Sequence, residues 1–255
     1  MNYFIKNLLL AIVISTSHTS HAQLPRPDTI ATNMGNLVIQ PIFHGALVLK
    51  WNGKTIYIDP YNGAEAYKNL PAPDLILITD IHPDHLDLAT LNALNTSKAQ
   101  FIVPQAVAGE LPPAYSGKVT VVNNDATTIQ AGITITAIPM YNLPETPDTR
   151  HPKGRGNGYV LQLGNKRLYI SGDTGDIPEM RSLKNIHIAF VCMNLPYTMS
   201  VEQAASAVLD FKPQIVYPYH FRGKKGFSDT RAFKTLVNND DEKIEVRLKD
   251  WYMKN

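Results

Sequence analysis

The segment Asp80-Ile81-His82-Pro83-Asp84-His85 (residues 80–85) directly follows a short apolar run, Leu-Ile-Leu-Ile-Thr, at residues 75–79. That run has the length and isoleucine content of a strand buried on both faces. After it, the apolar spacing over residues 87–95 predicts a helix with Asp87 as its N-cap. Two imidazoles and two carboxylates therefore lie in a loop fixed at both ends by regular structure.

This loop predicts a metal site. His82 and His85 lie three residues apart around Pro83, so both rings can turn toward one point, and Asp84 between them supplies a hard oxygen ligand. The alternative is a solvated loop that only caps the helix. Cys192 is the single cysteine, which excludes an intrachain disulfide framework and any Cys-rich metal cage. A metal in this protein must be bound by histidine and carboxylate.

The two halves of the chain resemble each other. Residues 46–51, the Asn52-Gly53 pair and residues 55–58 predict a β-hairpin with a type I′ turn. Residues 161–173 (LQLGNKRLYISGD) align without gaps on residues 49–61 (LKWNGKTIYIDPY) and share Leu, Lys, Tyr and Ile at four positions. Each hairpin is followed by another apolar strand, so the second half predicts a second sheet built like the first.

Further elements are predicted after the second hairpin: a strand at 188–192, a helix at 201–211 opened by a capping box between Ser200 and Gln203, a strand at 215–217, a helix near 229–237 and a strand near 245–248. Residues 23–36 are expected to be a polar lead. The uneven alternation of helices and strands predicts an α/β fold in which two mixed sheets pack together with helices outside. We find no internal linker, so residues 23–255 are expected to form a single domain.

Residues 1–22 are predicted to be a cleavable secretory signal. Lys6 precedes the apolar run 8–14, and Ser20-His21-Ala22 forms a small-x-small cleavage site. The apolar run is shorter than the roughly 20 residues that a membrane-spanning helix needs. We therefore expect a mature protein without a membrane anchor, in a bacterial periplasm or secreted; an uncleaved N-terminal anchor is the alternative.

Composition limits the classes of partner. The 24 Lys and Arg residues nearly balance the 22 Asp and Glu residues, which gives a formal charge of +2 and argues against a dedicated nucleic-acid-binding protein. A content of 44% hydrophobic residues is enough for a substantial core. The expected partner is a small-molecule substrate, and homo-oligomerisation is left open.

The segment 79–85 resembles the THxHxDH signature of the metallo-β-lactamase fold. The later His, bridging Asp and final His of that family have matching positions at His151, Asp173 and His220, the last two within SGDTG and PYHF. The resemblance covers essentially all of residues 23–255. Within the superfamily, the Gly-His element near residue 44 and the GDTG element are most similar to the branch of ascorbate-6-phosphate lactonase and N-acyl-phosphatidylethanolamine phospholipase D.

The resemblance implies a four-layer αββα sandwich with a dinuclear metal site between its two sheets. Carried over by position, site one would use Asp80, His82 and His151, and site two Asp84, His85 and His220, with Asp173 shared. Asp80 departs from the motif, which has His there. Zn²⁺ is the expected ion. Because a carboxylate adds hard oxygen character, Mn²⁺ or Fe²⁺ becomes an alternative. One or two divalent ions are therefore expected, since site one can also be weak.

Other residues are assigned around this site. His44, Asp59 and Asp87 are expected to orient the ligands from behind; capping for the two aspartates and a buried core position for His44 are the alternatives. Cationic and polar groups near the expected ligands predict binding of an anionic substrate; solvated or packing roles are the alternative. These groups are Tyr141, Asn142, Arg150, Lys153 and Arg155.

The predicted function is a metal-dependent hydrolase in which a metal-activated water attacks a small, anionic ester or lactone. Asp84 is the predicted catalytic residue, because it would face that water and steer its proton. The alternatives are a phosphodiesterase of the same fold, β-lactam hydrolysis, a di-iron redox protein, and a non-catalytic metal- or ligand-binding module whose first metal site has degenerated.

Overall fold

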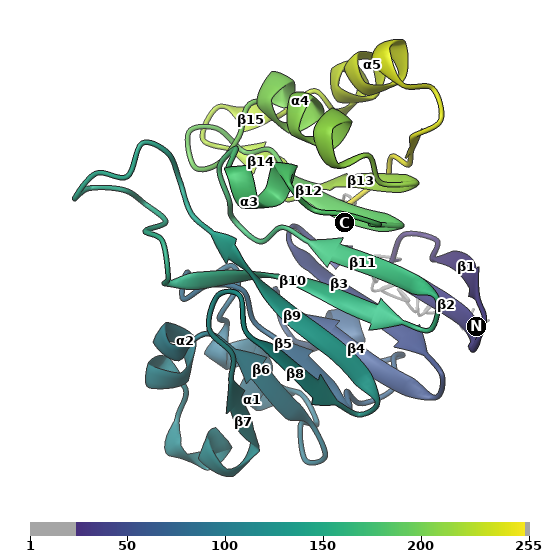
Figure 1. The fold of residues 1–255 in the computed structure, drawn as a ribbon. Coiled ribbons are helices and arrows are strands. Elements are labelled where there is room, and N and C mark those ends of the chain that lie inside the picture. Colours follow the sequence, from purple (N-terminus) through teal and green to yellow (C-terminus); the bar gives the residue numbers. More distant parts are fainter. Residues whose placement is uncertain (1–23, 253–255) are drawn as a thin grey trace, which may run out of the picture.

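The computed structural model describes residues 24–252, so the predicted signal at residues 1–22 lies outside the described residues. Two seven-stranded sheets face each other, with helices on both outer sides (Figure 1). This arrangement confirms the predicted αββα sandwich of two mixed sheets.

The first sheet follows chain order: β1 (Asp28–Thr32), β2 (Gly35–Phe43), β3 (Ala46–Trp51), β4 (Lys54–Ile58), β5 (Leu75–Leu77), β6 (Gln100–Val103) and β7 (Val119–Val121). Strands β1 to β4 pair antiparallel, and β4 to β7 pair parallel. The expectation of a polar lead over residues 23–36 is wrong in part, because β1 pairs with β2 along its whole length. Its half-buried alternation over five residues was too short to stand out in the sequence.

The second sheet has the order β16-β13-β12-β11-β10-β9-β8. Its strands are β8 (Thr127–Gln130), β9 (Ile133–Met140), β10 (Gly156–Leu163), β11 (Lys166–Ile170), β12 (Ile188–Cys192), β13 (Ile215–Tyr219) and β16 (Glu245–Val246). Again an antiparallel part, β8 to β11, continues into parallel strands. A two-stranded ribbon, β14 (Arg222–Gly223) with β15 (Gly226–Phe227), completes the strands of the described chain.

The internal repeat is confirmed at the level of register. In the first hairpin Leu49 pairs with Ile56, and in the second Leu161 pairs with Leu168, as the alignment of the two sequences requires. Asn52 and Gly53 both have positive φ, 47° and 71°, which is the backbone of a type I′ turn. In both hairpins the second strand, β4 or β11, pairs parallel with the strand on its other side.

The helices are α1 (Leu88–Ala93), α2 (Gln105–Glu110), α3 (Pro178–Arg181), α4 (Val201–Phe211) and α5 (Thr230–Asp240), with 3-10 turns at η1 (Ala64–Tyr67) and η2 (Pro113–Lys118). Figure 1 shows α1 and α2 outside one sheet and α3, α4 and α5 outside the other. The predicted capping box at the start of α4 is present, with Ser200 and Gln203 bonding reciprocally. No helix among residues 24–252 is long and apolar enough to cross a membrane.

The core follows the two-residue period of the strands. In β3, Leu47 and Leu49 point into the layer between the sheets, whereas Val48 packs with Ile76 and Phe101 under the helices of the first sheet. The two sheets thus share one interior. At its edge, where parallel strands of both sheets end, the polar loops meet.

Candidate metal centre

All seven predicted ligands lie in loops at this edge: Asp80, His82, Asp84 and His85 after β5, His151 between β9 and β10, Asp173 after β11, and His220 after β13. Their side-chain atoms form three groups of three, each with ligand atoms within 4.8 Å of one another: Asp80–His82–His151, His85–Asp173–His220 and His44–Asp84–His220. Residues that are up to 176 positions apart in the sequence therefore converge. Only His44 was not predicted as a ligand.

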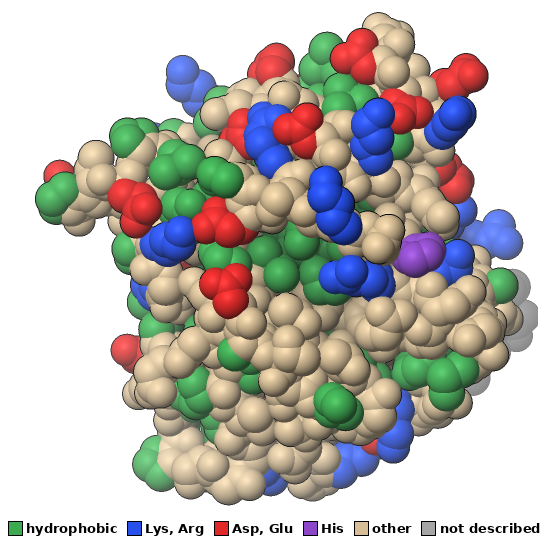
Figure 2. Space-filling view, viewed as in Figure 1, with side chains coloured by type: hydrophobic (Ala, Val, Ile, Leu, Met, Phe, Trp, Pro, Cys, Tyr) green, Lys and Arg blue, Asp and Glu red, His purple; other side chains and the backbone are tan. Residues whose placement is uncertain are grey.

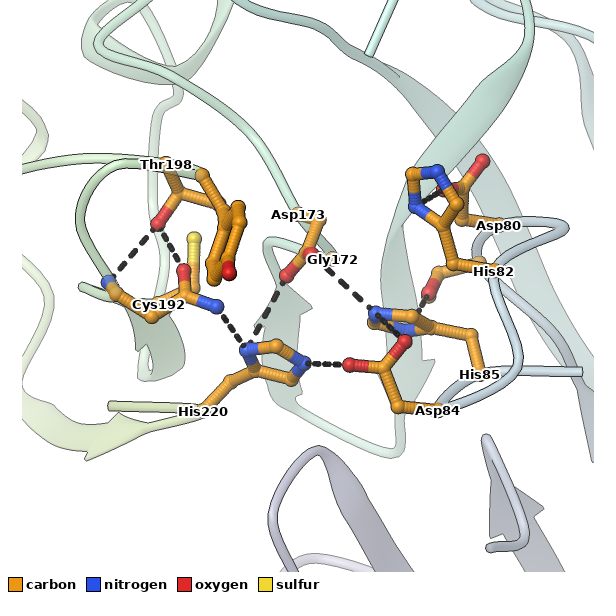
Figure 3. A network of polar contacts seen from close by, with 12 residues as sticks. Asp80, His82, Asp84, His85, Gly172, Asp173, Cys192, Thr198 and His220 are labelled. Carbon is orange, nitrogen blue, oxygen red and sulfur yellow. Dashed lines mark hydrogen bonds and ion pairs between the residues drawn. The ribbon is translucent and has the colours of Figure 1, made fainter. Parts of the chain in front are cut away.

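Asp173 is the central carboxylate. Its Oδ2 lies 3.4 Å from Nε2 of His85 and 3.4 Å from Nε2 of His151, and its Oδ1 lies 3.3 Å from Nδ1 of His220. Figure 3 shows Asp173 pointing toward His85 and His220, with Asp84 across from it and Asp80 and His82 farther along the loop. This position between the groups suits a ligand shared by two sites.

Several buried ligand atoms have no hydrogen-bond partner among the described residues. These atoms are Nε2 of His85, Nε2 of His151, Nε2 of His220 and Oδ1 of Asp173. Buried polar atoms are normally hydrogen-bonded, and an unsatisfied one costs free energy. Four such atoms converging in one place fit a bound cation, because imidazole nitrogens and carboxylate oxygens are its usual ligands.

The charges in the centre also favour a cation. Burial disfavours the charged ring of His85, but Asp173, Asp59 and Asp84 raise the pKa of that imidazole well above its ordinary value of 6.5. Conversely, burial raises the pKa of Asp173, but His220 and His85 together hold it well below its ordinary value. The carboxylates of the centre thus favour positive charge beside them, which a divalent cation would supply when bound.

Side chains behind the ligands fix their orientation. Asp59 lies 2.8 Å from Nδ1 of His85 and accepts from both the backbone N–H and the hydroxyl of Thr79, so it lies where the sequence predicted. Oδ1 of Asn142 lies 2.7 Å from Nδ1 of His151. These contacts leave Nε2 of both rings facing the centre.

Two expectations about such supporting residues need correction. Asp87 accepts from the backbone N–H and hydroxyl of Thr90 and caps α1, so it is the capping alternative that the structure bears out. Asn142 was expected to bind the anionic substrate. Its Oδ1 instead faces His151, and its Nδ2 donates to the carbonyl of Tyr197.

The family follows from comparison with known proteins. Residues 54–221 match the model of the beta-lactamase superfamily domain. A "UPF0173 metal-dependent hydrolase" of Thermococcus onnurineus is 32% identical over 204 residues, which covers 76% of this chain and 89% of that one. This chain belongs to the metallo-β-lactamase superfamily. The predicted lactonase-like branch within it stays a prediction.

Two solved structures of the superfamily fold are similar to this one. A protein of Parabacteroides distasonis described as a metal-dependent hydrolase is 38% identical, covers 89% of this chain and 99% of its own, and superposes with a TM-score of 0.76. Igni18 of Ignicoccus hospitalis, described as a metallo hydrolase, is 24% identical, covers 83% and 94%, and has a TM-score of 0.70. The second likeness shows the fold alone.

His44 is part of this metallo-β-lactamase centre. Its ring stacks on His220 at 3.7 Å between centroids, and its Nε2 lies 3.2 Å from Oδ2 of Asp84. The hydroxyl of Tyr252 accepts from the backbone N–H of Arg222 and lies 2.5 Å from Nδ1 of His44. We therefore assign the Tyr252 proton to the bond with Nδ1, which leaves His44 to donate from Nε2 to Asp84. Burial, with the neighbouring His220, lowers the pKa of His44 to about 4, in agreement with this neutral tautomer.

Arg155 was predicted to bind substrate, but it forms an ion pair with Asp80. Its Nε donates to Oδ1 of Asp80 at 3.0 Å and its Nη2 to Oδ2 at 2.9 Å. Asp80 is fully buried, which by itself would raise its pKa. Its hydrogen bond with His82, the nearby charge of His85 and its bond with Arg155 outweigh burial and lower the pKa to about 2. The residue that departs from the family motif thus has a cationic partner within the chain.

A cavity of about 280 Å³ opens onto the centre. Its lining includes metal-site residues and residues of the surrounding loops: His44, His82, Asp84, Arg150, Asp173, Asn194, Tyr197, Arg222 and Gly223. Of the five predicted substrate-binding residues, only Arg150 lines it. Tyr141 and Lys153 instead donate to the two carboxylate oxygens of Glu179. Tyr141 therefore has a structural role rather than a role in the cavity.

The sequence also missed residues of the site. The Asn194 amide lies 2.8 Å from Nδ1 of His220, and Tyr197 packs under Arg150, whose guanidinium carbon lies 4.5 Å from the ring centroid. Both follow β12, so they share the strand-end position that identified the ligands. Their residue types, amide and aromatic, carried no signal by themselves.

Proposed function

We propose that this protein, a metal-dependent hydrolase, cleaves a small anionic ester or lactone. The observation that carries the proposal is the pair of arginines, Arg150 and Arg222, which line the same cavity as Asp84 and Asp173. Arg150 stacks on Tyr197, and the guanidinium carbon of Arg222 lies 5.4 Å from the ring centroids of both Phe43 and Tyr252. Aromatic packing restrains both cations beside the centre, where they suit a carboxylate or phosphate group.

The ligand set would hold one or two cations through the histidines His85, His151 and His220 and the carboxylates Asp84 and Asp173. When bound, a divalent cation lowers the pKa of a coordinated water and polarises a substrate oxygen. Zinc is the proposed native ion, since three imidazoles are among its preferred ligands; manganese and iron are the alternatives.

The chain's own residues then act in three ways. Asp84 is partly exposed in the cavity, with 32% of its side chain accessible. The nearby charges of His85 and His220, with a hydrogen bond from His44, lower its pKa against the effect of burial. Its ionised carboxylate would accept a hydrogen bond from the attacking water and steer its proton. His44 donates to Asp84 and fixes its orientation. Arg150 and Arg222 bind the anionic part of the substrate.

Hydrolysis of a phosphodiester is the second candidate. Two guanidiniums at one cavity favour it, because the planar donors of arginine match phosphate oxygens as well as carboxylate oxygens. The size of the cavity favours a small substrate in either case.

The test is an activity screen of the metal-loaded protein against lactones, carboxylate-bearing esters, phosphodiesters and β-lactams. We expect turnover with an anionic ester or lactone and a loss of about 100-fold or more in kcat/KM for Asp84→Asn. Arg150→Ala and Arg222→Ala should each raise KM about tenfold for the anionic substrate, with little effect on a neutral ester of the same size.

Lys153→Ala is the matched control, because Lys153 is a cation of the same loop whose partner is Glu179 rather than the cavity. Equal losses for anionic and neutral substrates in the two arginine variants would contradict the proposal. For localisation, we propose that residues 1–22 direct export, and fractionation of cells expressing the full chain tests this directly.

A further inference from the structure

Asp80, the position where this chain departs from the family motif, is bound on both oxygens by Arg155. The guanidinium donates Nε to Oδ1 and Nη2 to Oδ2, in the bidentate geometry of the strongest ion pairs. Nη2 also lies 3.5 Å from Nε2 of His82. Arg155 thus contacts two of the three residues of site one.

Most of the other polar atoms of site one also have partners. Oδ2 of Asp80 lies 2.7 Å from Nδ1 of His82 in addition to its bond from Arg155. Among the site-one residues, only Nε2 of His151 lacks a partner within the described chain.

Site two is different. Nε2 of His85, Nε2 of His220 and Oδ1 of Asp173 are all buried, and within residues 24–252 none of them has a hydrogen-bond partner. A cation entering site two would meet buried polar atoms that have no hydrogen-bond partner to displace. A cation entering site one would have to break a bidentate ion pair and lie beside a guanidinium of the same sign.

We propose that Arg155 acts as the fixed cation of site one, so that this protein binds a single divalent ion tightly, in site two. The negative charge that Asp80 brings in place of a neutral histidine is thereby neutralised from within the chain. Because His82 lines the cavity, the guanidinium also places permanent positive charge beside it. The inference deepens the proposed function but does not depend on any substrate.

Metal stoichiometry tests the proposal. The full chain, freed of metal by a chelator, is titrated with Zn²⁺ and with Mn²⁺ by calorimetry, and the bound ions are counted by native mass spectrometry. We expect one tight equivalent, with any second equivalent bound at least about 100-fold more weakly. In the double variant Asp80→His/Arg155→Met, which restores the family's histidine and removes the guanidinium, two equivalents should bind with affinities within about tenfold of each other.

Arg155→Met alone leaves Asp80 buried without its partner and can fail to fold, so Asp80→Asn/Arg155→Met provides a neutral pair; it should show a stronger second site than the wild type. Lys153→Met, which removes a cation of the same loop that does not contact Asp80, should keep one equivalent. Circular dichroism verifies that each variant is folded.

Two equivalents bound with similar affinity by the wild type would overturn the inference, as would a double variant that still binds one. Neither result bears on hydrolysis. A wild type that binds one ion but hydrolyses none of the substrates would leave this inference standing and overturn the proposed function, and a wild type that binds no ion would overturn both.

Discussion

At the scale of single residues, the centre depends on backbone conformations that L-residues rarely adopt. His44 and His220 have positive φ of 56° and 48°, and Asp59 has 43°. The backbone N–H of His220 donates to the carbonyl of His44, which joins the two strained turns. Such strain persists where the surrounding structure overdetermines it, as it does at many functional sites.

Gly45 permits this arrangement. A Cβ at that position would lie 2.8 Å from Cδ2 of His220, closer than real contacts allow. Gly45→Ala should therefore displace the His220 ring and weaken metal binding by about tenfold or more, as loss of ligand orientation does. A chelator-competition titration measures the affinity, and an unchanged value would show that the ring does not need this position.

Asp59 and Asp87 form a matched pair for testing ligand orientation. Asp59→Asn removes the charged partner of His85 and should lower metal affinity about 10- to 100-fold. Asp87→Asn changes only the cap of α1, so its effect should be a loss of less than about 1 kcal/mol in the free energy of unfolding, with unchanged metal affinity. Calorimetric titration and urea unfolding of both variants separate the two effects; equal metal affinities would argue against orientation by Asp59.

At the scale of elements, the ligands are placed by strand ends. Three strands, β5, β11 and β13, run toward the same edge, and each is followed by a loop that carries predicted ligands. The β9–β10 segment adds His151 from a loop that extends away from the body of the molecule (Figure 1). The helices lie on the outer faces and contribute stability rather than chemistry.

The α4 capping box allows that division to be tested. Ser200 accepts from the backbone N–H of Gln203, and Gln203 returns a bond to the backbone N–H of Ser200. Ser200→Ala should cost about 1 kcal/mol in the free energy of unfolding. Metal affinity should stay at the wild-type value. Urea unfolding and metal titration test this, and a fall in metal affinity without loss of stability would contradict it.

At the scale of the whole molecule, a polar cluster joins the two ends of the described residues, 24–252. Asp28 in β1 accepts from Tyr217 and pairs with Arg247 and Lys249. Acidic and basic side chains are interspersed over the upper part of the face in Figure 2, in keeping with the small net charge. The cluster connects the first strand of one sheet with the end of the other.

This cluster predicts a pH dependence. Burial raises the pKa of Asp28, but bonds from Lys249 and Tyr217 outweigh it and leave the pKa below its ordinary value of 3.8. A lowered pKa in the folded state means that the stabilisation is complete above the unfolded pKa and is lost as pH falls through the folded one. Asp28→Asn should cost about 1 kcal/mol at pH 7 and less at pH 3. A difference independent of pH, measured by urea unfolding, would contradict this.

Metal binding should stabilise the whole fold, because the ligands come from both sheets. At a free metal concentration about 100 times the Kd, the gain is about 2.7 kcal/mol, which corresponds to roughly 5–10 °C in Tm for a domain of this size. Thermal melts with and without chelator measure it. An unchanged Tm would indicate that no ion binds the folded chain at this centre.

Local sequence determined much of this protein. The hairpin with Asn52-Gly53, the α4 capping box and the polar loop after an apolar strand all depend on neighbouring residues, so their patterns are readable without the fold. The convergence of the seven predicted residues at one edge was predictable because a family signature fixes their order and, except at Asp80, their types. Short edge strands such as β1 were missed, since their pairing partner rather than their own composition makes them strands.

Only the tertiary structure decided which charged groups meet. Arg155 and Asp80 are 75 residues apart, and no local pattern distinguishes an arginine that binds substrate from one that neutralises a buried carboxylate. The same holds for Asn194 and Tyr252, whose roles arise from long-range packing. The reason is physical: main-chain hydrogen bonding and hydrophobic periodicity act over a few residues, whereas electrostatic pairing in the centre depends on distances that folding alone sets.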